Sequence, residues 1–209
     1  MSSGIQVLGL ALGILGWLGS IVACALPQWK VTAFIGNNII TAQIFWEGLW
    51  MTCVVQSTGQ MQCKVYDSML ALSLDLKASR AILVISLLVA LVAGLAGIAG
   101  GKWTNCLEDG SGKARVAIAA GVLFLTAGVL GLIPPSWTAH QVITDFYNPF
   151  VHEAMKRELG AGVFIGWASA VFMVIGGGLL CSSCQLNKAE EATRYKIAPD
   201  HRKEGTSYV

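Results

Sequence analysis

The stretch Ala81–Gly101 reads AILVISLLVALVAGLAGIAGG and contains no charged residue. Its 21 residues are enough to cross a bilayer as a helix, because a span needs about 20 apolar residues at a rise of 1.5 Å per residue. Three further stretches of 22 to 24 residues are equally free of Asp, Glu, Lys and Arg: Ile5–Leu26, Val116–Trp137 and Ala161–Cys184. The sequence therefore predicts an α-helical membrane protein with four spans.

Charge is confined to the segments that connect these stretches. Of the 209 residues, 55% are hydrophobic and 26 are charged, 14 basic and 12 acidic. A soluble domain with amphipathic helices places charges along the exposed face of every helix, so this segregation argues against a soluble enzyme. The net charge of +2 and the absence of a dense Lys/Arg stripe argue against a nucleic-acid partner.

Basic residues are denser in one connecting segment and in the C-terminal tail than in the other two connecting segments. Residues 102–115 hold three in 14 positions and residues 185–209 hold five in 25, against four in 53 for 28–80 and two in 23 for 138–160. The positive-inside rule then predicts that both termini are cytoplasmic and that 28–80 and 138–160 form extracellular loops. In the alternative, Ile5–Leu26 is a cleaved signal peptide, but no Lys or Arg precedes it.

Small residues stand four apart within the spans, at Gly9 and Gly13, Gly97 and Gly101, and Gly162 and Gly166. Such spacing lets helix backbones approach closely. We expect it to serve packing within the bundle rather than dimerisation, because four spans of one chain must first pack on each other. Pro134-Pro135 should kink the third span or mark its exit.

The longer outer loop is dense in Ile, Val, Phe, Trp, Tyr and Thr, the residue types that favour strands. A polar turn around Gly59 separates two strand-like runs, which predicts a hairpin from Cys53 to Cys63. Apolar and polar residues alternate in the second run, so Lys64 points away from the Cys63 face. We expect a Cys53–Cys63 disulfide, because the exterior is oxidising and a hairpin can bring the two Cα atoms within range.

The remaining chemistry is sparse. Cys106, Cys181 and Cys184 fall at the cytosolic membrane surface, where they are either S-palmitoylated or unmodified. His152-Glu153 opens like a zinc-protease motif, but Lys156 stands where the second His ligand is required. No phosphate-binding or dinucleotide fingerprint occurs, and no second cysteine pair completes a zinc site. We therefore expect no catalysis, no metal and no cofactor.

One constellation is more specific: Trp29, Gly48-Leu49-Trp50, Cys53, Cys63 and Arg80 follow one another in this order. It resembles the W-GLW-C-C signature of the claudin family, which the peripheral myelin protein and AMPA-receptor auxiliary groups share. The match extends over essentially the whole chain. Three features resemble the subgroup of claudins three, four, six and nine: Thr41–Leu72, the run Asp145-Phe146-Tyr147-Asn148-Pro149, and the final Tyr208-Val209.

The resemblance implies a left-handed four-helix bundle, residues 1–184, that carries an extracellular antiparallel β-sheet. Four strands would come from the first outer loop and one from the second. Trp29, Gly48, Leu49 and Trp50 would seat the sheet on the bundle at the membrane surface. The chains would polymerise side by side into tight-junction strands of the plasma membrane and join strands of the neighbouring cell.

Contacts between copies are also implied by the resemblance. Met69 would insert beside Phe146 and Tyr147 of an adjacent copy in the same membrane, or alternatively pack within its own chain. Contacts with the opposite cell would use Asn148, Pro149, Phe150 and Val151. Part of the subgroup binds a clostridial enterotoxin through a segment reading N-P-L-V, and Phe150 departs from that pattern.

The family's leading selectivity position follows the second cysteine, which places Lys64 there. We therefore expect a paracellular barrier that disfavours cations and has weak anion permeability. In the alternative, Lys64 is a solvated surface lysine without a role in selectivity. A different class of function, an auxiliary subunit of a channel or receptor without strand formation, shares the signature.

The tail, 185–209, is polar enough to stay unfolded. Its end, Ser207-Tyr208-Val209, suits the PDZ domain of a zonula occludens-type scaffold.

Overall fold

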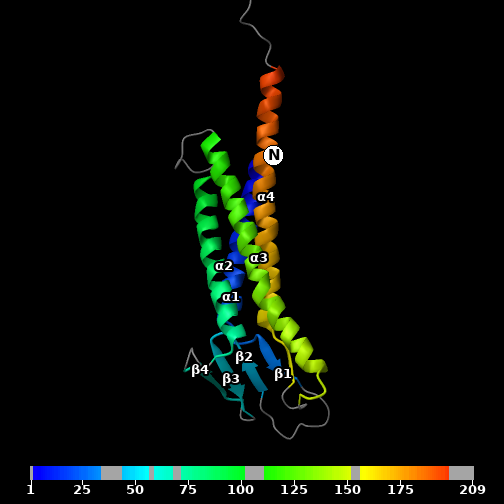
Figure 1. The fold of residues 1–209 in the computed structure, drawn as a ribbon. Coiled ribbons are helices and arrows are strands. Elements are labelled where there is room, and N and C mark those ends of the chain that lie inside the picture. Colours follow the sequence, from blue (N-terminus) through cyan, green and yellow to red (C-terminus); the bar gives the residue numbers. More distant parts are fainter. Residues whose placement is uncertain are drawn as a thin grey trace, which may run out of the picture.

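The computed structural model describes residues 2–33, 44–56, 59–67, 72–101, 111–151 and 156–197. Four long helices stand side by side, with a small sheet at one end of them (Figure 1). The helices are α1 (Ser2–Ala25), α2 (Leu74–Ala99), α3 (Ser111–Tyr147) and α4 (Ala161–Ile197). Each is long and apolar enough to cross a membrane, which confirms the four predicted spans.

Three helices run well beyond the charge-free stretches: α2 begins at Leu74, α3 ends at Tyr147 and α4 ends at Ile197. α3 has 37 residues, about 55 Å, so it continues past the bilayer into residues expected to be a loop. In this extension Ala139 and Val142 are buried while Thr144 and Asp145 are exposed. This amphipathic pattern is invisible to a search for uncharged spans. Pro134 and Pro135 lie inside α3, and its outer end leans away from the bundle (Figure 1).

The expectation of an unfolded tail is wrong for residues 185–197, which continue α4 as far as Ile197. The segment is polar, but Gln, Leu, Lys, Ala, Glu and Arg are all good helix formers. It also extends an existing helix, so it avoids the unfavourable nucleation step that an isolated peptide must complete. The rest of the predicted tail, 198–209, lies outside the described residues.

Small residues line the helix contacts. A Cβ at Gly176 of α4 would lie 2.6 Å from the backbone nitrogen of Gly13 and 2.6 Å from the carbonyl oxygen of Gly9, both on α1. Gly16 is equally close to the backbone of Ser169. The glycines therefore pack α1 against α4 within one chain, in agreement with the predicted intramolecular use.

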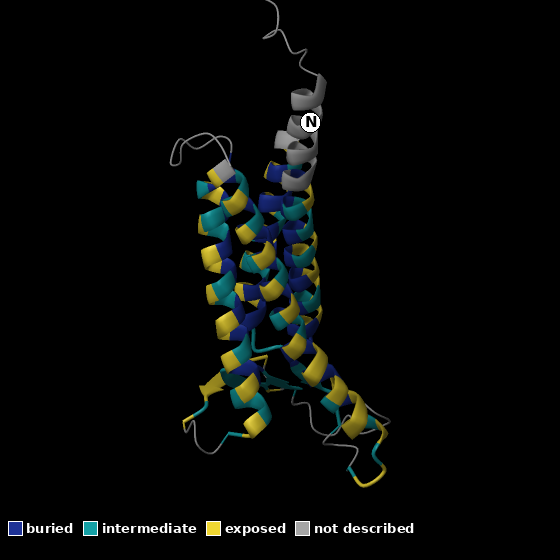
Figure 2. Cartoon of the chain, turned by 45° about the horizontal axis from the view of Figure 1, so that its top comes forward, coloured by how far each residue is buried: buried dark blue, intermediate teal, exposed yellow. Residues whose placement is uncertain are grey.

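Burial follows the same plan over the length of the bundle. Buried residues lie toward the interior of the bundle and exposed residues toward its outside (Figure 2). Many of the exposed residues are large and apolar. Two polar side chains form hydrogen bonds between helices: Trp17 donates from Nε1 to the Leu87 carbonyl at 3.1 Å, and Ser86 donates to the Ala127 carbonyl at 2.7 Å. The exposed leucines, valines and phenylalanines of the outer surface suit contact with lipid.

The sheet has five strands in the order β4-β3-β2-β1-β5, and every pairing is antiparallel. The first outer segment supplies β1 (Lys30–Thr32), β2 (Ile44–Glu47), β3 (Met51–Val55) and β4 (Met61–Val65). The second supplies β5 (Arg157–Leu159), which pairs with β1. The four-plus-one composition implied by the family resemblance is confirmed.

Candidate functional site

The sheet rests on the bundle through a buried cluster that joins both parts. Trp29 and Leu49 are each 2% exposed, and they pack with Cys24, Leu83, Ala139 and Val163 from all four helices. The Trp29 indole donates from Nε1 to the carbonyl oxygen of Ala23 at 2.8 Å. The indole thus buries its apolar body and satisfies its one donor, which fits the seating role expected for it.

Gly48 allows the chain to turn onto the end of α1. A Cβ there would lie 2.5 Å from the Cα of Pro27 and 2.9 Å from the carbonyl oxygen of Leu26. Both neighbours are backbone atoms, which cannot move aside as a flexible side chain would. Only glycine fits, because β2 must end directly above the point where the first helix ends.

Arg80 of α2 also contacts the residues that join the sheet to the bundle. Its Nε donates to the Leu49 carbonyl at 2.6 Å, and its guanidinium lies over the rings of Trp50 and Tyr66, at 4.8 and 5.3 Å from their centroids. The Trp50 indole in turn donates to Cys24 Sγ at 3.4 Å. All five signature positions other than the cysteines therefore lie at the joint between sheet and bundle.

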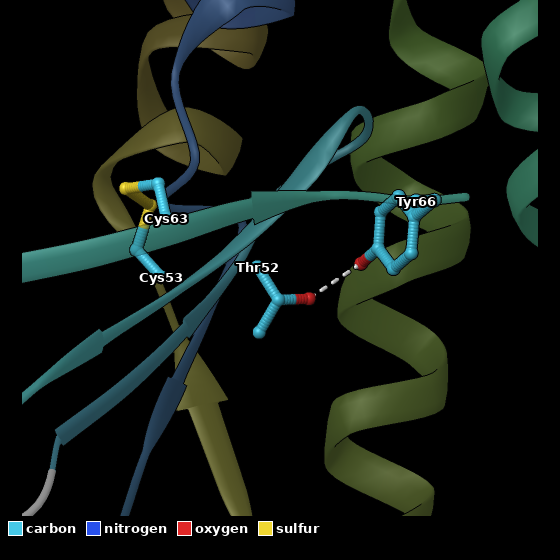
Figure 3. The surroundings of a disulfide bond; sticks show 4 residues. All are labelled: Thr52, Cys53, Cys63 and Tyr66. Carbon is cyan, nitrogen blue, oxygen red and sulfur yellow. Dashed lines mark hydrogen bonds between the residues drawn. A yellow bond between two sulfur atoms is a disulfide. The ribbon is translucent and has the colours of Figure 1, made fainter.

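The predicted disulfide is confirmed: Cys53 of β3 is bonded to Cys63 of β4, its direct cross-strand partner. Figure 3 shows the two sulfurs on one side of the hairpin and the side chains of Thr52 and Tyr66 on the other. The Thr52 hydroxyl donates to the Tyr66 hydroxyl at 3.0 Å, and Tyr66 donates to the Gly48 carbonyl at 3.3 Å. The hairpin is thus tied across its strands by a covalent bond on one face and hydrogen bonds on the other.

Strand pairing assigns every strand residue to one of two faces, because side chains alternate along a strand and partners share a face. We call the side opposite the disulfide the polar face. It is formed by Lys30, Thr32, Phe45, Glu47, Thr52, Val54, Gln62, Lys64, Arg157 and Leu159. Lys64 pairs with Thr52 and therefore lies on this face, as the alternation predicted.

Carboxylates lie close to the basic residues of the polar face. Lys64 Nζ is 2.6 Å from Asp67 Oδ2, and both side chains are largely exposed. The hydrogen bond from Lys64 to this carboxylate, with the attraction between the charges, raises the pKa of Lys64 above its ordinary value. Arg157 Nη2 is 2.7 Å from Glu47 Oε1, and its Nε donates to the same oxygen at 3.1 Å.

Lys30, the third basic residue of the polar face, reaches a carboxylate through an amide. Its Nζ donates to Gln141 Oε1 at 3.2 Å, and Gln141 Nε2 donates to Asp75 Oδ2 at 2.6 Å. This chain links β1, the outer end of α3 and the first turn of α2. Sequence reasoning did not identify Glu47, Gln141, Asp75 or Arg157, since their partners are 66 to 111 positions away.

The expected contact residues of the second outer segment lie at the end of α3. The rings of Phe146 and Tyr147 meet edge to face at 5.6 Å, and Tyr147 is 79% exposed. Phe150 is 95% exposed, and its backbone N–H is bonded by Asn148 Oδ1 at 3.0 Å in a tight turn. Pro149 and Val151 flank it, exposed and half-buried respectively. Met69 lies outside the described residues.

The predicted sites at the opposite end are described in part. Cys181 turns its thiol toward α3, at 3.9 Å from the Ile118 carbonyl oxygen. Cys184 belongs to α4, and only its backbone is described. Cys106 and the terminal Ser207, Tyr208 and Val209 lie outside the described residues.

These features define a four-span membrane protein with a disulfide-bonded sheet seated on one end of its bundle. A family model described as the PMP-22/EMP/MP20/Claudin family matches residues 3–180. Claudin-like protein ZF-A9 of Danio rerio is 64% identical over 209 residues, the whole of both chains. Human Claudin-4 is 60% identical over 183 residues, 88% of each chain. Human Claudin-6 is 57% identical over 194 residues, 93% of this chain and 88% of its own.

The chain belongs to the claudin family. It is a multi-pass membrane protein of the tight junction with a structural role there, and it is not an enzyme. Among the relatives, Claudin-3, Claudin-4 and Claudin-6 belong to the subgroup that the sequence resembles.

Proposed function

We propose that this chain forms tight-junction strands that seal the space between cells and disfavour the passage of cations. The observation that carries the proposal is the position of Lys64. Its side chain is 79% exposed on the polar face of β4, an edge strand outside the membrane. A charge there meets the water between cells rather than the core of the sheet.

The charges of the strands support the same sign. Along the polar face the strands carry three basic residues, Lys30, Lys64 and Arg157, against one acidic residue, Glu47. Two unit charges 4 Å apart in water interact by about 1 kcal/mol, equivalent to about a fivefold bias. The screening length at physiological salt is about 8 Å, so the bias requires a narrow passage.

Lys64→Asp in a polarised epithelial monolayer tests this assignment. We expect dilution potentials to shift toward cation permeability, by at most about 25-fold because the substitution changes the charge by two units, and by less after screening. Val65→Asp is the matched control, because it adds an acidic group one residue away on the opposite face, where Val65 is 62% exposed. A monolayer in which Lys64→Asp leaves the ratio of sodium to chloride permeability unchanged would refute the assignment.

Strand formation is tested in fibroblasts that lack tight junctions. Freeze-fracture strands at cell contacts are expected on expression, whereas an auxiliary channel subunit would form none.

The proposed contacts within one membrane are made by Met69, Phe146 and Tyr147. Those between cells are made by Asn148 to Val151. The exposure of Tyr147 and Phe150 supports this. Phe150 differs from the toxin-binding N-P-L-V pattern, so we do not assign enterotoxin as a partner.

We further propose that both termini are cytoplasmic and that Val209 binds a PDZ scaffold of the zonula occludens type. The start of α1 and the end of α4 lie at the end of the bundle opposite the sheet (Figure 1). The disulfide supports an extracellular sheet, since disulfides persist in oxidising surroundings. Deletion of Val209 should abolish capture by such a scaffold. Undiminished capture would exclude this site.

A further inference from the structure

Each basic residue on the strands of the polar face is accompanied by a carboxylate. Lys64 pairs with Asp67, Arg157 pairs with Glu47, and Lys30 reaches Asp75 through Gln141. Neither Asp67 nor Asp75 belongs to a strand, so counting strand residues alone overstates the positive charge of this face. The field that a passing ion meets depends on these partners as much as on the lysines and the arginine.

The Lys64–Asp67 pair differs from the other two in its exposure. Its side chains are 79% and 74% exposed, whereas those of Arg157 and Glu47 are 25% and 33% exposed. The groups that join Lys30 to Asp75 are part-buried. Lys64 and Asp67 are therefore the more accessible to water, and their charges are the more open to a passing ion.

The position of Asp67 is fixed by the residue before it. The Tyr66 backbone N–H donates to the Trp50 carbonyl at 3.4 Å, and its hydroxyl is bonded to Thr52 and Gly48. The Tyr66 ring also lies beneath the buried guanidinium of Arg80. Because Tyr66 is held at both ends, the backbone leads into Asp67 from a defined position beside β4.

We infer that Asp67 is a second determinant of charge selectivity, which offsets the charge of Lys64 and limits the preference of the barrier for anions. This inference rests on the selectivity role proposed for Lys64. Opposite charges 2.6 Å apart act on a distant ion as a dipole, whose field falls faster with distance than that of a single charge. The pair thus weakens the bias of Lys64 against cations without abolishing it.

The raised pKa of Lys64 agrees with this geometry. Its first cause is the hydrogen bond to Asp67, and its second is the attraction of the same carboxylate. The two groups are therefore coupled in charge as well as close in space.

Asp67→Asn in the epithelial monolayer tests the inference. The amide keeps the size of the side chain and removes its charge, so Lys64 is left uncompensated. The ratio of chloride to sodium permeability should rise by about twofold to fivefold. Asp67→Glu should keep the original ratio. Glu158→Gln is the matched control, because it removes one negative charge from an exposed residue of β5 on the opposite face and should change nothing.

Combining Asp67→Asn with Lys64→Gln separates this inference from the proposed function. Because the fields of the two charges add at a passing ion, Asp67→Asn should raise the chloride-to-sodium ratio by a similar factor in the Lys64→Gln background. No effect of Asp67→Asn in a monolayer that responds to Lys64→Asp would overturn the inference and leave the role of Lys64 intact. Absence of any response to Lys64→Asp would instead overturn both.

Discussion

Arg80 of α2 donates a hydrogen bond from Nε to the backbone carbonyl of Leu49, across 2.6 Å and 31 positions of sequence. The guanidinium is buried between the rings of Trp50 and Tyr66. One side chain therefore fastens the turn between β2 and β3, the end of β4 and the start of a membrane span. We expect this contact, together with the buried cluster around Trp29, to hold the sheet on the bundle.

Replacing Arg80 should loosen the sheet. Arg80→Ala leaves the Leu49 carbonyl without this donor and removes both ring contacts, a loss of about 3 kcal/mol. Arg80→Lys should recover only part of it, because an ammonium cannot stack as a planar guanidinium does. The thermal midpoint of the detergent-solubilised protein measures the loss. Ser73→Ala is the control, since this exposed residue caps α2 without a side-chain hydrogen bond; equal midpoints for Ser73→Ala and Arg80→Ala would contradict the expected role.

The glycine triplet of α4 offers a prediction with an internal control. Gly176→Ala forces a methyl group against the backbone of Gly9 and Gly13, which should separate α1 from α4 at a cost of about 1 to 3 kcal/mol. Gly178→Ala meets nothing within 4 Å and should be neutral or stabilising by up to about 1 kcal/mol. Delivery to the cell surface and thermal midpoint should both separate the two variants. If they behave alike, close α1–α4 packing is not what Gly176 provides.

Much of this arrangement follows from sequence because the bilayer imposes simple demands. An uncharged stretch such as Ala81–Gly101 has few alternatives to a span, and the alternation around Cys63 fixes one face of a hairpin. Both predictions depend on residues that are close in sequence. The disulfide follows from the hairpin, since Cys53 and Cys63 become direct partners once the turn is placed.

The remainder depends on pairings that no local pattern reveals. β5 has three residues and finds its place beside β1, more than 120 positions earlier in the chain. In the sequence, Arg80 is simply a charged residue at the border of a span, and nothing there indicates that its side chain is buried. The Lys64–Asp67 ion pair could have been predicted, because the two residues are only three positions apart. The hydrogen bonds of the Tyr66 hydroxyl, which position the chain just before Asp67, are visible only in the structure.

Reduction of the disulfide should destabilise the sheet and spare the helices. Joining residues ten positions apart stabilises the folded hairpin by roughly 3 kcal/mol in the chain-entropy model. Cys53→Ser with Cys63→Ser should therefore lower the thermal midpoint while leaving the helical circular dichroism nearly unchanged. In the unreduced wild-type protein, alkylation and mass spectrometry should find both cysteines unreactive. Free thiols at these two positions in protein purified without reductant would contradict the extracellular assignment of the sheet.

Arg157 and Glu47 supply the last prediction, because they join the two outer segments. From β5 the guanidinium reaches past β1 to the Glu47 carboxylate on β2, donating two hydrogen bonds to one oxygen and a further one to Thr32 Oγ1 at 3.4 Å. Hydrogen bonds between charged groups are worth about 1.5 to 3 kcal/mol. Arg157→Ala should thus release the second outer segment and make it more sensitive to protease added to intact cells.

Exchanging the two charges distinguishes this ion pair from a general effect of charge. Glu47→Arg alone places two cations together and should be as disruptive as Arg157→Ala. Combined with Arg157→Glu it restores an attractive pair, and protease resistance should partly return. Glu158→Gln, one residue along β5 and on the opposite face, should leave the cleavage rate unchanged. No recovery in the double variant, alongside wild-type rates for Arg157→Ala, would show that β5 is held by its backbone pairing with β1 alone.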